Sequence, residues 1–118
     1  MQVYHFSPKK DYTIALAHTR QTAHVERAIG FQADGEPARA MAELGRALAE
    51  NRACRQPIMT TSCSQEQLDS LYRLHALHTE DPSDYATMLQ LRMMLNVPTE
   101  RGERIEREVA EQAGAFCI

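Results

Sequence analysis

The segment "YATMLQLRMMLNVP" (Tyr85–Pro98) constrains the fold more than any other part of this chain. Ten consecutive positions of this segment, residues 88–97, contain seven apolar side chains: Met88, Leu89, Leu91, Met93, Met94, Leu95 and Val97. An ordinary surface helix has one apolar stripe, whereas a helix that is apolar on nearly every side has to be enclosed. The segment therefore requires either a central place in the fold or a partner that covers its outer side.

The composition indicates what kind of core could enclose it. The chain has 118 residues, a length that suits one domain, and it has no tryptophan and only 6% aromatic residues. Charged residues make up 25% and apolar residues 43%, which is ordinary for a globular protein. We therefore expect one small domain over residues 1–118, with an aliphatic core of Leu, Ile, Met and Ala.

The sequence disfavours membrane, secreted and nucleic-acid-binding proteins. No apolar run has the length of a membrane span, and the N-terminus lacks a basic stretch followed by an apolar run. Three cysteines without such a leader indicate reduced thiols, so we expect a cytoplasmic location. Residues 60–118 carry five Lys and Arg against ten Asp and Glu, which opposes a phosphate-binding face. We therefore expect neither a membrane nor a nucleic acid as partner.

Apolar periodicity predicts a mainly α fold, a compact bundle of four to five short helices. The predicted helices cover residues 19–30, 37–53, 64–78, 85–97 and 99–114. "QVYHF" (residues 2–6) has the composition of a strand, and residues 12–18 fit either a strand or a helix. A short N-terminal strand or β-hairpin therefore remains open beside the bundle.

Local signals predict where these helices begin and how they pack. Pro37 suits a first helical residue, and "SQEQ" predicts a capping box between Ser64 and Gln67. Asp81 or Ser83 is expected to cap the helix that Pro98 then stops, and Thr99 to cap the last one. Small residues of the second helix are expected to let another helix approach closely: Ala40, Gly45 and Ala47.

The candidates for chemistry are histidines and cysteines. His75 and His78 lie three apart on a helix, and Cys54 and Cys63 could add two thiolates for zinc. The paired cysteine spacing of zinc sites is missing, and Cys117 lies one residue from the end without a catalytic signature around it. We therefore expect no metal, no cofactor and no enzymatic activity, and a small Cys/His enzyme or zinc protein ranks third.

Two interpretations of the Met/Leu-rich helix remain. It is either a central core helix, or it packs against the rest of its own chain with one side and presents the other side to a second chain. Methionine is common on surfaces that accommodate partners, and the neighbouring helices have narrow apolar faces. We expect Leu91, Met94 and Leu95 to face the core. The predicted partner or homodimer interface contains Tyr85, Met88, Leu89, Arg92, Met93 and Phe116.

The size, the helicity and the element "TMLQLRMMLNV" (Thr87–Val97) resemble the small bacterial antiactivators that bind and silence quorum-sensing transcription factors. The resemblance implies a non-enzymatic homodimer that masks a surface of a transcriptional activator. The alternative is a phage-type inhibitor of a host defence complex, also without chemistry. Both expectations describe a protein that acts by binding another protein.

Overall fold

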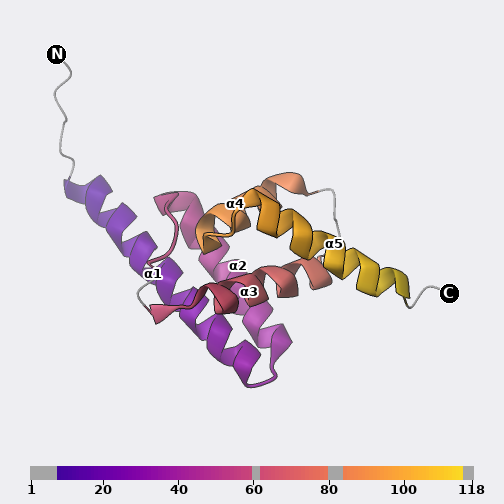
Figure 1. Cartoon of the computed structure of the whole chain (residues 1–118). Coiled ribbons are helices and arrows are strands. Elements are labelled where there is room, and N and C mark those ends of the chain that lie inside the picture. The colour runs from indigo at the N-terminus through magenta and orange to yellow at the C-terminus, as the bar shows by residue number, and fades with distance from the viewer. Residues whose placement is uncertain (1–7, 60–61, 80–83, 116–118) are drawn as a thin grey trace, which may run out of the picture.

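The computed structural model describes residues 8–59, 62–79 and 84–115, and these ranges contain five α-helices and no strand. The chain folds as a compact helical domain in which α1 and α2 run antiparallel, α3 crosses them, and α4 and α5 follow (Figure 1). The five helices are α1 (Pro8–Ala33), α2 (Pro37–Cys54), α3 (Gln65–His78), α4 (Tyr85–Leu95) and α5 (Thr99–Ala115).

The first helix is longer than expected. Residues 12–18, which fitted a strand or a helix, are helical, so they form no strand of an N-terminal hairpin. The reason is a single buried stripe at helical spacing that runs through Ala17, Gln21, Val25 and Ala28 and already includes this segment. The expected strand over residues 2–6 lies outside the described residues.

The tight turn between α1 and α2 explains why these helices pack side by side. Gly35 has a φ of +74°, a conformation that glycine adopts without the strain of a Cβ, and Pro37 begins α2. Ala40 and Ala47 are fully buried, as the expected close helix approach requires. Gly45 is exposed instead, and nothing lies within 4 Å of where its Cβ would be, so its predicted packing role was wrong.

A buried polar network fixes the segment after α2. Asn51 Nδ2 donates to Gln21 Oε1 at 2.6 Å, and both side chains donate to the carbonyl of Gln56, at 3.0 and 2.9 Å. Gln90 Nε2 of α4 donates to Asn51 Oδ1 at 3.0 Å, and the backbone N–H of Ile58 donates to the carbonyl of Met94. Buried amides stabilise a fold only when they are paired, and this network ties α1, α2 and α4 together.

A buried carboxylate adds a second link between α1 and α2. Glu43 Oε2 lies 2.6 Å from His24 Nδ1, and Arg46 Nη1 donates to Glu43 Oε1 at 2.8 Å. The hydrogen bond with His24 and the nearby arginines hold the pKa of Glu43 below its ordinary value. Glu43 is therefore a paired anion at neutral pH, and it serves the packing of the hairpin.

The boundaries of α3 and α4 follow capping chemistry. The capping box of Ser64 and Gln67 is present as predicted. Asp84 caps α4 by accepting the N–H of Thr87, whereas the predicted caps Asp81 and Ser83 lie outside the described residues. The helix ends at Leu95, three residues before Pro98, because Asn96 adopts a left-handed conformation with a φ of 56°. Asparagine tolerates that conformation, which closes the helix before the proline does.

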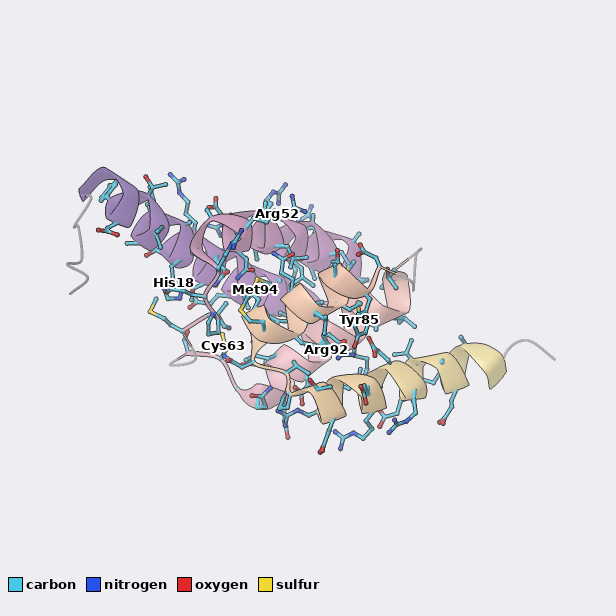
Figure 2. The ribbon with its side chains drawn as sticks, turned by 90° about the horizontal axis from the view of Figure 1, so that it is seen from above. His18, Arg52, Cys63, Tyr85, Arg92 and Met94 are labelled. Carbon is cyan, nitrogen blue, oxygen red and sulfur yellow. The ribbon has the colours of Figure 1, made fainter. Side chains whose placement is uncertain are left out.

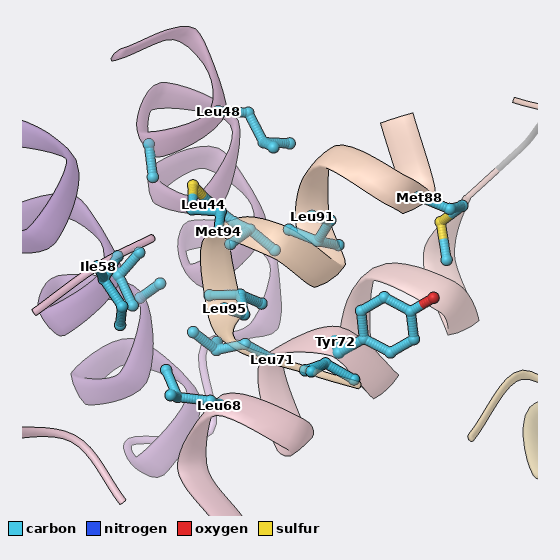
Figure 3. Close-up of a cluster of buried hydrophobic side chains, with 14 of the residues drawn as sticks. Leu44, Leu48, Ile58, Leu68, Leu71, Tyr72, Met88, Leu91, Met94 and Leu95 are labelled. Atoms are coloured by element: carbon cyan, nitrogen blue, oxygen red, sulfur yellow. The ribbon is translucent and has the colours of Figure 1, made fainter. Parts of the chain in front are cut away.

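Met94 and Arg92 extend from different sides of α4 (Figure 2). Leu91, Met94 and Leu95 are fully buried, which confirms the predicted core side of this helix. They meet side chains of α2, α3 and the segment after α2, including Leu44, Leu48, Ile58, Leu68 and Leu71 (Figure 3). The core is aliphatic as expected, apart from the buried ring of Tyr72.

Candidate functional site

An exposed row of large apolar side chains runs along α4. Tyr85, Leu89 and Met93 lie four residues apart, so they share one line along the helix, and they are 58%, 42% and 39% exposed. We call these three residues the α4 strip. They are three of the six predicted interface residues, and they contrast with the buried side chains on the other sides of the same helix.

Two other predicted interface residues are not on the surface of the chain. Met88 is 5% exposed and Arg92 is 4% exposed, so their expected solvent-facing position was wrong. Arg92 is buried because α5 packs against the side of α4 that carries it, and Met88 is buried as a member of the hydrophobic core. Phe116, the sixth predicted residue, lies outside the described residues.

Arg92 belongs to a buried polar cluster between α3, α4 and α5. Its Nε donates to the Tyr72 hydroxyl at 2.8 Å and its Nη2 to Glu106 Oε2 at 2.8 Å, while the Tyr72 hydroxyl donates to Glu106 Oε1 at 2.9 Å. Burial raises the pKa of Tyr72 to about 12, so the hydroxyl keeps its proton. The guanidinium carbon lies 6.0 Å from the centre of the Tyr85 ring. Arg92 is thus a packing residue that holds α5 on α4.

Gly102 of α5 makes this cluster possible, and sequence reasoning missed it. A Cβ at this position would lie 2.6 Å from Nε of Arg92, too close for two heavy atoms. Glycine within a helix costs about 1 kcal/mol relative to alanine, so its presence in the charged stretch "RGERIERE" was the available signal of a close contact. The glycine that admits a neighbouring side chain is therefore Gly102, and not Gly45.

A groove of about 520 Å³ lies on one flank of the strip, between α3, the start of α4, and α5. Tyr85 and Leu77, both exposed, form part of its wall, and Met88 and Val109 are its buried apolar members. The one carboxylate in its lining is Glu106, whose two oxygens already accept from Arg92 and Tyr72. The groove is therefore suited to apolar contact, and its carboxylate is committed to the fold.

A second groove, of about 440 Å³, lies on the other flank, between α2 and α4. Leu89 and Met93 of the strip line it together with Gln90, Asn51, Arg52 and Arg55. Arg52 and Arg55 are exposed, and Arg55 follows the last residue of α2 in a left-handed conformation. This flank combines apolar side chains with two cationic ones.

The histidine and cysteine candidates do not come together. Cys54 is buried and donates from Sγ to Gln21 Oε1 at 3.4 Å, and burial raises the pKa of Cys63. Burial also lowers the pKa of His75, while His78 is exposed. Over residues 8–59, 62–79 and 84–115 no group of three or more His, Cys, Asp or Glu is placed to hold a metal ion. Cys117 lies outside these ranges.

Within the described part of the chain, no helix has the length and apolar character to span a bilayer. Comparison with known proteins identifies no relative: no protein-family model, curated protein or solved structure matches this chain. The site is therefore interpreted from its own residues.

Proposed function

We propose that this protein is a non-enzymatic interaction module that binds a protein partner through the α4 strip. The observation that carries the proposal is the row of Tyr85, Leu89 and Met93, three large apolar side chains left exposed on one line of a helix whose opposite side is buried in the core. Isolated exposed apolar residues are common on proteins, but a contiguous row between two grooves is typical of a docking surface.

The geometry suits a partner segment that lies along the helix. The row spans two turns of α4, and Leu77 of α3 extends the apolar surface next to Tyr85. Partners that recognise such surfaces place apolar side chains at helical spacing into the grooves beside the row. The polar side chains near the strip, Gln90 and Asn51, already form a hydrogen bond with each other. A partner that covers them therefore leaves this hydrogen bond intact.

The partner class that we propose is a transcriptional activator, which the protein would hold inactive. This assignment is supported by the likeness in size, helicity and apolar helix to quorum-sensing antiactivators. The alternative partner is a component of a host defence complex, which a phage-type inhibitor would block through the same strip. Both assignments need an apolar docking helix and no chemistry from this chain.

Affinity capture from a bacterial host followed by mass spectrometry tests the function. The charge-introducing variants Leu89→Asp and Met93→Asp are expected to lose the partner, because a carboxylate at the centre of an apolar contact is desolvated without a counter-charge. Ala42→Asp, on an exposed position of α2, introduces the same charge elsewhere and is expected to retain it. Capture of a transcriptional regulator supports the activator assignment, and capture of a defence nuclease supports the alternative. If all three variants retain the same protein, the strip is not the docking surface.

We also propose that two copies of the chain associate through the strip when the partner is absent. Sedimentation equilibrium is expected to give a species of twice 13.4 kDa that Leu89→Asp converts into the monomer. A monomer over the whole concentration range contradicts self-association but leaves binding of a different protein intact.

A further inference from the structure

Two arginines beside the α4 strip have no acidic partner in the described chain. Most arginines on these helices do pair with a carboxylate: Arg27, Arg39, Arg46, Arg73, Arg92, Arg101 and Arg104. Among the described residues, Arg52 and Arg55 form no ion pair or side-chain hydrogen bond, and the same holds for Arg20 and Arg107 on other surfaces. Arg52 and Arg55 line the groove between α2 and α4, whereas Arg20 and Arg107 line neither of the two grooves beside the strip.

The two charges and the apolar strip share one groove. Arg52 and Arg55 line the same space of about 440 Å³ as Leu89 and Met93. Arg52 lies on α2, and it is on the side of α4 away from Arg92 (Figure 2). A ligand that covers Leu89 and Met93 from this side therefore lies next to two unpaired guanidinium groups, which form planar, bidentate contacts with carboxylates.

We propose that the groove between α2 and α4 selects partners through an amphipathic segment that presents carboxylates beside apolar side chains. The apolar side chains of that segment cover Leu89 and Met93, and its Asp or Glu residues pair with Arg52 and Arg55. This inference rests on the proposed docking function of the α4 strip and specifies which partner segment the strip accepts. The charge complementarity sets specificity and the rate of association, while the apolar contact supplies most of the affinity.

A role in helix stability alone does not account for this arrangement. Cations near the C-terminus of a helix interact favourably with its dipole, and Arg52 and Arg55 lie at the end of α2. That interaction needs neither side chain to line a groove with exposed apolar residues. Nucleic acid is also a poorer occupant, because two arginines neutralise few phosphates and Leu89 and Met93 would face a charged backbone.

Selection from a random peptide library on the immobilised protein tests the inference without a known partner. The enriched peptides are expected to have two apolar residues at helical spacing, flanked by Asp or Glu. A fluorescein-labelled copy of the strongest peptide is then titrated with each variant, and its anisotropy gives the dissociation constant. Replacement of its carboxylates by amides is expected to weaken binding about tenfold. Added salt is expected to weaken the binding of the unmodified peptide as well.

Matched variants separate the groove charges from net charge. Arg52→Gln/Arg55→Asn removes two unpaired cations, and asparagine tolerates the left-handed conformation of residue 55. We expect this variant to bind the acidic peptide about tenfold more weakly. Arg20→Gln/Arg107→Gln removes two unpaired cations from other surfaces and is expected to bind like the wild type. Thermal melts of both variants check that the fold is retained.

The other outcomes overturn the inference in distinguishable ways. If no peptide is enriched, if enriched peptides lack carboxylates, or if both double variants weaken binding equally, Arg52 and Arg55 do not select the partner. If Leu89→Asp abolishes binding while Arg52→Gln/Arg55→Asn does not, the docking function of the strip stands and the selection by charge fails. A fluorescent DNA duplex that binds, is lost with Arg52→Gln/Arg55→Asn and is retained with Leu89→Asp assigns the groove to nucleic acid.

Discussion

The two flanks of α4 contain the same residue types and use them in opposite ways. On the α5 flank, Arg92 is 4% exposed and bonds to Tyr72 and Glu106, so its charge is paired within the protein. On the α2 flank, Arg52 is exposed without an ion pair in the described chain, and Leu89 and Met93 beside it are open to solvent. The charge on one flank is paired within the protein, whereas the charges on the other flank are available to a partner.

The difference shows that an arginine among apolar residues is not by itself a sign of an interface. Such an arginine is a common interface anchor, which is why Arg92 was predicted as one. In the fold, Gly102 lets α5 approach the Arg92 side chain, and Glu106 neutralises its charge. No described side chain does the same for Arg52 and Arg55. The position of a neighbouring helix therefore decides which arginine is free.

The largest difference in stability is expected between alanine substitutions of two leucines of α4. Leu91→Ala removes a fully buried side chain and is expected to lower the free energy of unfolding by about 2–5 kcal/mol. Leu89→Ala truncates a side chain that is 42% exposed, so the expected loss is about 1 kcal/mol. Urea titrations of both variants, at a protein concentration at which the chain is a monomer, measure the difference. Equal losses at that concentration would contradict the exposed position of Leu89.

Substitution of the arginines by methionine compares the two flanks directly. Arg92→Met removes the donor to Glu106 Oε2 and to the Tyr72 hydroxyl oxygen, and because Glu106 is about a third exposed we expect a loss of about 2–3 kcal/mol. Arg52→Met breaks no ion pair or side-chain hydrogen bond within the described chain, and we expect a change below about 0.5 kcal/mol. The measurement is the midpoint of thermal unfolding. A tolerated Arg92→Met would mean that the α5 flank is held by apolar contacts alone.

Alanine substitutions of Gly102 and Gly45 are expected to change the stability by smaller amounts and in opposite directions. Gly102→Ala places a Cβ against Arg92, and the overpacking is expected to exceed the gain in helix propensity, for a net loss of about 1–2 kcal/mol. Gly45→Ala enters open space on an exposed part of α2 and is expected to stabilise the protein by about 0.5–1 kcal/mol. Circular dichroism melts distinguish the two. Stabilisation by both substitutions would show that Arg92 moves aside easily.

The smallest change in stability is expected from acidification, and it concerns His75, a partly buried residue of α3. Burial lowers the pKa of His75 below its ordinary value of 6.5, although Asp84 opposes the shift. Since the unfolded chain then binds the proton more readily, stability is expected to fall as the pH drops below about 6.5. His75→Leu should flatten the unfolding free energy between about pH 7 and pH 5, and Asp84→Asn, which keeps a helix cap, should steepen it.

Arg52→Gln is the control for this titration, because arginine keeps its charge throughout that range and the variant should retain the wild-type profile. A pH profile that His75→Leu leaves unchanged would assign the acid sensitivity to another group. Glu43, whose pKa lies below its ordinary 4.5, is expected to contribute only at lower pH, because its stabilisation is lost as its carboxylate becomes protonated.

Local features of the fold could be predicted where one residue or one short pattern decides them. The capping box of Ser64 and Gln67, the start of α2 at Pro37 and the core side formed by Leu91, Met94 and Leu95 all follow the predictions. The extent of α1 and the end of α4 did not, because a strand-like composition at residues 12–18 competes with a helical stripe, and Asn96 ends α4 before Pro98. Tertiary contacts decide between such alternatives, and a short window of sequence does not include the distant residues that make those contacts.

The sequence by itself determined that α4 needs apolar surroundings on more than one side, since that follows from the residues of the helix alone. Only the tertiary structure decided which sides receive those surroundings from the chain. Arg92 is buried because α5 packs over it and Met88 because it belongs to the hydrophobic core, whereas Tyr85, Leu89 and Met93 stay exposed beside the grooves. The physical reason is that burial depends on residues distant in sequence, such as Gly102 and Glu106, whose approach to α4 is set by the packing of whole helices.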